Sequence, residues 1–194
     1  MINRLDDDKI EFDFEGIGAK LEIWAFERHI TKQRSDRNGF CANIMEEMSE
    51  YVDAIRKNDT HEIVDAISDI IVFSMVEMHK MGISPDSVMF YYDNKHNDND
   101  TDSNFIDNII DDMGLWLNDD VPEKFNSLTN LISHCAFELL NIGYEPAKVL
   151  HETFREINSR TGEWDENSQK WKKYKTLEAM RLWYNANYEK CKIV

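Results

Sequence analysis

The chain has 194 residues, enough for one domain or two small repeats, and a formal net charge of −16 at neutral pH. This negative charge excludes a protein that binds a DNA or RNA polymer mainly through phosphate contacts, because such contacts depend on Lys and Arg. Only 7 glycines and 3 prolines are present, and apolar residues recur at helical spacing, so we predict an all-α protein without a convincing strand.

We expect a cytoplasmic protein from the cysteines and from the absence of long apolar runs. Cys41, Cys135 and Cys191 are scattered and show no ligand spacing, so we expect free thiols in a reducing cytoplasm. Residues 1–15 are acidic and lack the apolar core of a signal peptide. No apolar run is long enough to cross a membrane.

The first predicted helix covers residues 16–31. Trp24 lies on its amphipathic face with Leu21, and it either belongs to the core or stacks on a nucleotide base. A polar turn, residues 33–39, follows this helix. Asn38 is the expected cap of the next helix.

The stretch 43–82 predicts two helices joined by a short link at residues 57–60, which makes them antiparallel neighbours. The second helix is apolar nearly all round, as is typical of a buried helix. Asp65 and Asp69 nevertheless share one stripe of it with Glu62. Buried carboxylates destabilise a fold by several kcal/mol each unless something positive neutralises them.

Two carboxylates from each of these helices are predicted to converge. They are Glu47 and Glu50 on the first helix, and Glu62 and Asp65 on the second. Such an all-oxygen cluster suits Mg²⁺, with Mn²⁺ as a substitute. Simpler explanations exist for parts of it, since a Glu-rich face is often solvated and Glu62 also fits a capping box with Asp59. Neither explains Asp65 and Asp69 within an apolar run.

Gly82 ends this helix pair, and Ser84 followed by Pro85 predicts a further helix that carries Val88, Met89 and Tyr92. The polar tract 93–104 has no periodicity and is predicted to be a linker.

The second half of the chain repeats the first, with residues 16–97 as one repeat and 105–173 as the other. A duplicated pair of antiparallel helices is therefore predicted. The positions equivalent to Glu47, Glu50, Glu62, Asp65 and Asp69 are Asp112, Leu115, Glu123, Asn126 and Asn130. Three of the five acids are lost or neutralised, so we expect one metal site per chain, in the first repeat.

Residues 151–173 concentrate positive charge after the second repeat. The residues that suit a triphosphate are Arg155, Asn158, Arg160 and Lys170. Alternatively, these cations complement the dipole at a helix end. Trp164 and Trp171 either cover a base or anchor a loop. A final helix, residues 176–190, is expected to close the bundle with Leu177, Met180, Trp183 and Tyr184.

Glu47-x-x-Glu50 and Glu62-x-x-Asp65 together resemble the signature of the all-α nucleoside triphosphate pyrophosphohydrolases, the MazG-like proteins and dimeric all-α dUTPases. Residues 62–83 are similar to phage-type MazG-like helices. Residues 157–171 resemble the late segment that contacts nucleotide in the dUTPase branch. The resemblance covers residues 17–173 and implies one MazG-like domain.

The resemblance implies Mg²⁺-dependent hydrolysis of a (deoxy)nucleoside triphosphate at the α-phosphate, giving monophosphate and pyrophosphate. Glu47, Glu50, Glu62 and Asp65 would hold the metal, and Glu47 or Glu50 would activate water. The substrate would contact Asp69, Trp24, Arg155, Asn158, Arg160 and Lys170. The substrate is left as dUTP, dCTP or a purine deoxynucleotide, and residues 151–173 slightly favour dUTP. The sequence does not distinguish a monomer from a homodimer.

Two other functions fit the same residues. One is a non-catalytic helical protein that binds a divalent ion or a nucleotide in a regulatory role. The other is a structural protein whose acidic face docks on a basic partner. A pure ion sensor should gain no stability from added nucleotide, and a docking protein should keep its stability and binding in EDTA.

Overall fold

The computed structural model describes residues 2–6, 9–32, 36–93, 105–118, 121–168 and 170–193. The predicted linker, residues 93–104, lies outside these ranges except for Asp93. The helices are α1 (Ile17–Glu27), α2 (Arg37–Lys57), α3 (Thr60–Lys80), α4 (Phe105–Trp116), α5 (Val121–Asn141), α6 (Pro146–Ser159) and α7 (Leu177–Met180). The prediction of an all-α fold built from two helix pairs is confirmed.

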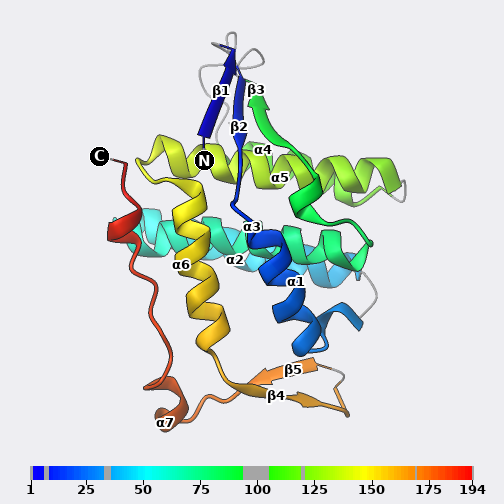
Figure 1. Cartoon of the computed structure of the whole chain (residues 1–194), viewed down its shortest axis with the longest axis vertical. Helices are drawn as coiled ribbons and strands as arrows, with labels where there is room; N and C mark the ends of the chain where they lie inside the picture. Colours follow the sequence, from blue (N-terminus) through cyan, green and yellow to red (C-terminus); the bar gives the residue numbers. More distant parts are fainter. Residues whose placement is uncertain are drawn as a thin grey trace.

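The two helix pairs, α2–α3 and α4–α5, pack on each other through α3 and α5, while α1 and α6 cross α3 (Figure 1). The α2–α3 link is short because Asn58 adopts a left-handed conformation, with φ 53°, and Asp59 caps α3 by accepting the N–H of Glu62 at 3.2 Å. One hydrophobic cluster runs through both pairs, and Ile67, Ile71 and Leu131 are fully buried in it.

Five short strands correct the expectation that the chain has none. β1 (Ile2–Asp6), β2 (Lys9–Phe12) and β3 (Phe90–Asp93) form an antiparallel sheet in the order β1-β2-β3. Phe12 and Phe90 face each other in the register and are both buried. The predicted helix after Pro85 is therefore wrong: a 3₁₀ turn, Pro85–Ser87, leads into β3, whose aromatic residues favour a strand.

The start of α1 is capped by a residue of the 3₁₀ turn Pro85–Ser87. The Asp86 carboxylate accepts the backbone N–H groups of Gly18 and Ala19 at 2.9 and 2.7 Å. A carboxylate from a distant segment thus satisfies the donors that a helix start leaves free. α1 ends at Glu27, and a separate 3₁₀ turn covers Ile30–Lys32, so the predicted helix 16–31 is broken near its end.

The cap of α2 is Asp36 rather than the predicted Asn38. The Asp36 side chain accepts the N–H of Asn38 at 3.2 Å. Helix α2 therefore starts two residues earlier than predicted, at Arg37. The error is small because both residues are good caps and lie two positions apart.

The C-terminal third differs most from the prediction. After α6, strands β4 (Gly162–Asp165) and β5 (Lys170–Lys173) form a hairpin at the opposite end of the molecule from the β1–β3 sheet (Figure 1). The predicted helix 176–190 is wrong: α7 has four residues, a 3₁₀ turn covers Tyr188–Cys191, and the rest is irregular. Leu177 and Met180 are exposed, so they do not close the bundle.

Polar groups of α6 explain this path. The Glu152 carboxylate accepts the Tyr184 hydroxyl and the Asn187 N–H, and Glu156 accepts the Ala186 N–H at 2.7 Å. These bonds replace those of a helix, and they bury Tyr188 against α3 and α6.

Cys41, Cys135 and Cys191 are free thiols, as predicted. In the described part of the chain, no helix combines the length and apolar composition that crossing a bilayer requires.

Candidate active site

The groove between α2 and α3 opens into a cavity of about 630 Å³ that is also lined by α1 and by the β4–β5 hairpin. Carboxylates from both helices line it. They are Glu46, Glu47 and Glu50 from α2, and Asp65, Asp69 and Glu77 from α3. The cavity therefore collects acids from the two helices that the sequence singled out.

Glu47 occupies the most unfavourable position for a negative charge. It is buried, and the pKa of its carboxyl is raised to about 8, first by burial and then by repulsion from Asp69, Glu50 and Asp65. Burial also raises the pKa of Asp69 to about 7, with Asp65 adding to the effect. These acids therefore lack enough positive charge to balance them, although Arg160 and Lys173 act in the opposite direction on Asp69.

Glu50 and Glu62 lie nearer to solvent. Burial, followed by repulsion from Glu46, Asp65 and Glu62, raises the pKa of Glu50. Glu62 is exposed in the first turn of α3 and is not among the described residues that line the cavity. Of the four predicted metal ligands, Glu47, Glu50 and Asp65 thus line the cavity and Glu62 does not.

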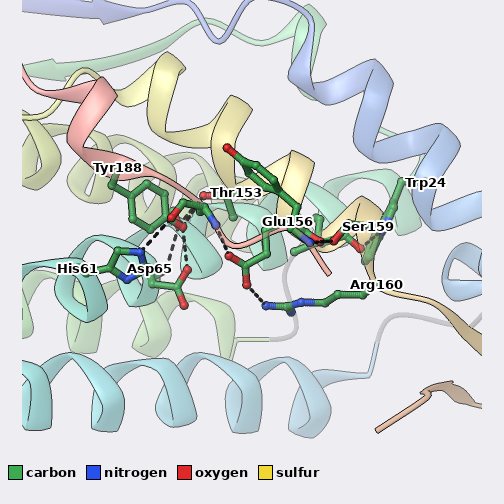
Figure 2. Close-up of polar contacts among 12 residues, drawn as sticks. Trp24, His61, Asp65, Thr153, Glu156, Ser159, Arg160 and Tyr188 are labelled. Carbon is green, nitrogen blue, oxygen red and sulfur yellow. Dashed lines mark hydrogen bonds and ion pairs between the residues drawn. The ribbon is translucent and has the colours of Figure 1, made fainter. Parts of the chain in front are cut away.

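Asp65 is held by a network that the sequence did not reveal (Figure 2). The Tyr188 hydroxyl donates to its Oδ1 at 2.7 Å and lies 3.0 Å from the Thr153 hydroxyl, which donates to Ser68 at 2.9 Å. His61 packs on the Tyr188 ring with 4.9 Å between centroids. The buried end of the chain therefore fixes the orientation of an acid on α3.

Cations face these acids from α6 and the hairpin. Arg160, Lys170 and Lys173 line the cavity. Arg160 also pairs with Glu156 at 2.5 Å, which orients its guanidinium. Burial and the nearby Arg160 lower the pKa of Lys173. Acids on one wall and cations on another suit a ligand that carries several negative charges together with a metal ion.

Two predicted substrate contacts lie elsewhere. Arg155 pairs with Glu152 at 2.6 Å and stacks on Tyr184, so it braces the C-terminal segment. Asn158 is exposed, and its backbone oxygen accepts from Arg28 at 3.3 Å. Neither is among the described residues that line the cavity. Sequence spacing could not show this, because the chain turns between them and Arg160.

Trp24 and Trp171 are among the described residues that line the cavity, and Trp164 is not. Trp24 lines the cavity and donates to the Ile157 oxygen at 3.4 Å, so it is both a packing residue and a wall. The Arg28 guanidinium lies 5.0 Å from the Trp24 ring and 5.4 Å from Trp171, which also lines the cavity. Trp164 packs edge-on against His29.

The ligand atoms that this site offers suit a hard divalent cation, because all are carboxylate oxygens on facing helices. Repulsion between Glu47 and Asp69 is the kind of imbalance that a cation would relieve. Among the described residues, however, no group of three or more His, Cys, Asp or Glu side chains is arranged to hold a metal ion as it stands. Binding would therefore require side-chain rotation.

Residues 24–96 match the family model of phosphoribosyl-ATP pyrophosphohydrolase. The match covers fewer than half of the 194 residues, but it includes Trp24, α2, α3 and all five first-repeat acids. That family belongs to the all-α NTP pyrophosphohydrolase superfamily, so the helix pair that carries the acids is similar to a domain of that superfamily. No curated protein and no solved structure shows a significant match.

Proposed function

We propose that this protein hydrolyses a (deoxy)nucleoside triphosphate at the α-phosphate in a Mg²⁺-dependent reaction. The observation that carries this proposal is that Glu47, Glu50, Asp65 and Asp69 line the same cavity as Arg160, Lys170 and Lys173. The family similarity of residues 24–96 supports it independently of the geometry.

The carboxylates of Glu47, Glu50 and Asp65 would hold the metal, with Glu62 completing the set after rotation. A bound divalent ion would draw negative charge from the phosphate oxygens. Glu47 or Glu50 would orient a water molecule and accept its proton as the oxygen attacks the α-phosphorus. The bond from the α-phosphorus to the bridging oxygen would break, and pyrophosphate would leave.

Arg160, Lys170 and Lys173 would bind the outgoing phosphates from the opposite wall. Trp24 and Trp171 would contact the nucleoside at the α1 and hairpin side of the cavity. The slight preference for dUTP is inferred from residues 151–173. Two of these residues, Arg155 and Asn158, lie away from the cavity. The base is therefore best decided by a substrate panel.

The test is pyrophosphate release from each common nucleoside and deoxynucleoside triphosphate with Mg²⁺. We expect release by the wild type, none with EDTA, restoration by Mn²⁺ and a strong loss in Glu50→Gln. Equal release by Glu50→Gln would contradict the proposal. If no nucleotide is hydrolysed but nucleotide with Mg²⁺ raises the melting temperature, the protein is a binding protein instead.

A further inference from the structure

The cavity continues along the α2–α3 groove beyond the acids, toward the C-terminal end of α3. The described side chains at this end include Asn43, Phe73, Phe40, Glu77 and Lys80. Glu77 lies eight residues after Asp69, or about 12 Å along the helix axis. That span is comparable to the distance between the α-phosphorus of a nucleotide and the far edge of its base.

Glu77 carries a buried oxygen that is not satisfied. The side chain is 2% exposed, and its Oε2 accepts from the Lys80 ammonium at 2.9 Å. Its Oε1 is buried and has no hydrogen-bond partner among the described residues. A buried acceptor without a donor destabilises a fold, so its presence calls for an explanation, and a bound ligand is one.

The second repeat shows how the fold satisfies the same carboxylate when no ligand is needed. Glu138 is the equivalent of Glu77, and its Oε2 accepts from Asn141, the equivalent of Lys80, at 3.4 Å. Its Oε1 accepts the Tyr51 hydroxyl at 3.2 Å. Only the first repeat therefore leaves this oxygen open, and it does so at a position that lines the cavity.

We propose that this end of the cavity holds the base of the substrate and that Glu77 Oε1 accepts an N–H from the amino group at position 4 of a pyrimidine or position 6 of a purine. The inference rests on the proposed function, which places the phosphates between the acids and the cations. A carboxylate paired with Lys80 offers only acceptors. Phe40 and Phe73 supply aromatic surface for the base at this end.

The substrate class that follows is a triphosphate whose base has an amino group at position 4 of a pyrimidine or position 6 of a purine. Cytosine and adenine have that group. Uracil and hypoxanthine would present a carbonyl oxygen to Glu77, and two acceptors cannot share a hydrogen bond. This preference replaces the slight preference for dUTP that the tail sequence suggested.

Two substrate pairs test the proposal, because dCTP differs from dUTP, and dATP from dITP, mainly by an amino group in place of a carbonyl. For the ring size that the wild type accepts, we expect kcat/KM to favour the amino member by about tenfold to a hundredfold. Glu77→Gln should abolish this preference, because an amide can present either a donor or an acceptor. The matched control, Glu138→Gln, should retain it.

Each outcome separates this inference from the proposed function. Hydrolysis of both members of a pair at equal kcat/KM by the wild type would overturn the base assignment and leave the hydrolase intact. Retention of the preference in a folded Glu77→Gln variant would also overturn it. If none of the four nucleotides releases pyrophosphate with Mg²⁺ but another nucleoside triphosphate does, the base assignment fails and the hydrolase stands. If no nucleoside triphosphate releases pyrophosphate, both proposals fail. The wild-type comparison decides even if Glu77→Gln does not fold.

Discussion

The two helix pairs share an origin in sequence but treat their acids in opposite ways. In α2–α3, Glu47 and Asp69 face a common cavity, and burial together with repulsion from Asp69 raises the pKa of Glu47. In α4–α5, the equivalent of Glu47 is Asp112, which is buried and bonded to His134 at 2.8 Å. The second pair has thus satisfied its acid internally, whereas the first has kept unbalanced charge at the position where a cation and a phosphate could bind.

The same contrast extends to the residues that surround each pair. The C-terminal segment supplies Tyr188 to Asp65 in the first pair, and α2 supplies Tyr51 to Glu138 in the second. The first contact orients an acid at the cavity, and the second is a part-buried hydrogen bond between the two helix pairs. Comparison within one chain therefore separates the residues of a site from those of a scaffold.

The largest difference is expected between Asp65→Asn and Asp112→Asn. Asp65 lies at the cavity, so its substitution should lower kcat/KM for triphosphate hydrolysis by about a hundredfold to ten-thousandfold. Asp112→Asn should leave activity within about twofold, because its carboxylate is bonded to His134. Pyrophosphate release by both purified variants measures this, with circular dichroism as the check on folding. Equal losses in the two variants would erase the distinction between the pairs.

His134→Leu should destabilise the α4–α5 pair without changing the site in the α2–α3 pair. It leaves the buried Asp112 carboxylate without its ring nitrogen partner, so unfolding in urea should show a loss of about 2 kcal/mol. Catalytic activity under folding conditions should not change. A large drop in kcat together with unchanged stability would mean that the second pair takes part in the reaction.

Tyr188→Phe should affect the site, and Tyr51→Phe should affect only the scaffold. Each change removes one hydroxyl that donates to a carboxylate, at 2.7 Å in Tyr188 and 3.2 Å in Tyr51. Loss of the orienting bond to Asp65 should weaken Mg²⁺ activation by about tenfold, as judged from the Mg²⁺ concentration at half-maximal rate. Tyr51→Phe should leave that concentration unchanged. A shift of the same size in both variants would show that the Tyr188 effect is a general loss of stability.

Glu152→Gln should lower the free energy of unfolding by about 1 kcal/mol at neutral pH, because it weakens the hydrogen bonds that hold the C-terminal segment. Hydrogen bonds from Tyr184, Asn187 and Arg155 lower the pKa of Glu152 against the opposing effect of burial. A lowered pKa in the folded state means that the stabilisation is present above the unfolded pKa and disappears as pH falls through the folded value. Urea unfolding of wild type and variant should therefore differ near pH 7 and converge in acid.

The sequence predicted the features that local patterns control. The short α2–α3 link, the Asp59 cap and the stripe with Asp65 and Asp69 all follow from spacing and capping chemistry within a few residues. The duplication predicted the α4–α5 pair, in which Asp112, the equivalent of Glu47, is bonded to His134.

The features that the sequence missed depend on distant partners. Val88, Met89 and Tyr92 are predicted from the sequence to lie on one helix, but pairing with β2 places Phe90–Asp93 in a strand. Residues 176–190 have apolar residues at helical spacing, but the carboxylates of α6 bind their backbone and side chains in an irregular path. Tyr188 gave no local sign of a bond to Asp65, which lies 123 positions earlier. The open oxygen of Glu77 also required three-dimensional information, because its equivalent in the other repeat is satisfied by Tyr51.

Calorimetric titration of Mg²⁺ into protein that is saturated with an α,β-imido triphosphate analogue tests the central claim most directly. The account predicts Mg²⁺ binding by the wild type and by Asp112→Asn, and binding at least about tenfold weaker in Asp65→Asn. Equal Mg²⁺ affinity in Asp65→Asn and the wild type, or no Mg²⁺ binding by the wild type, would contradict it.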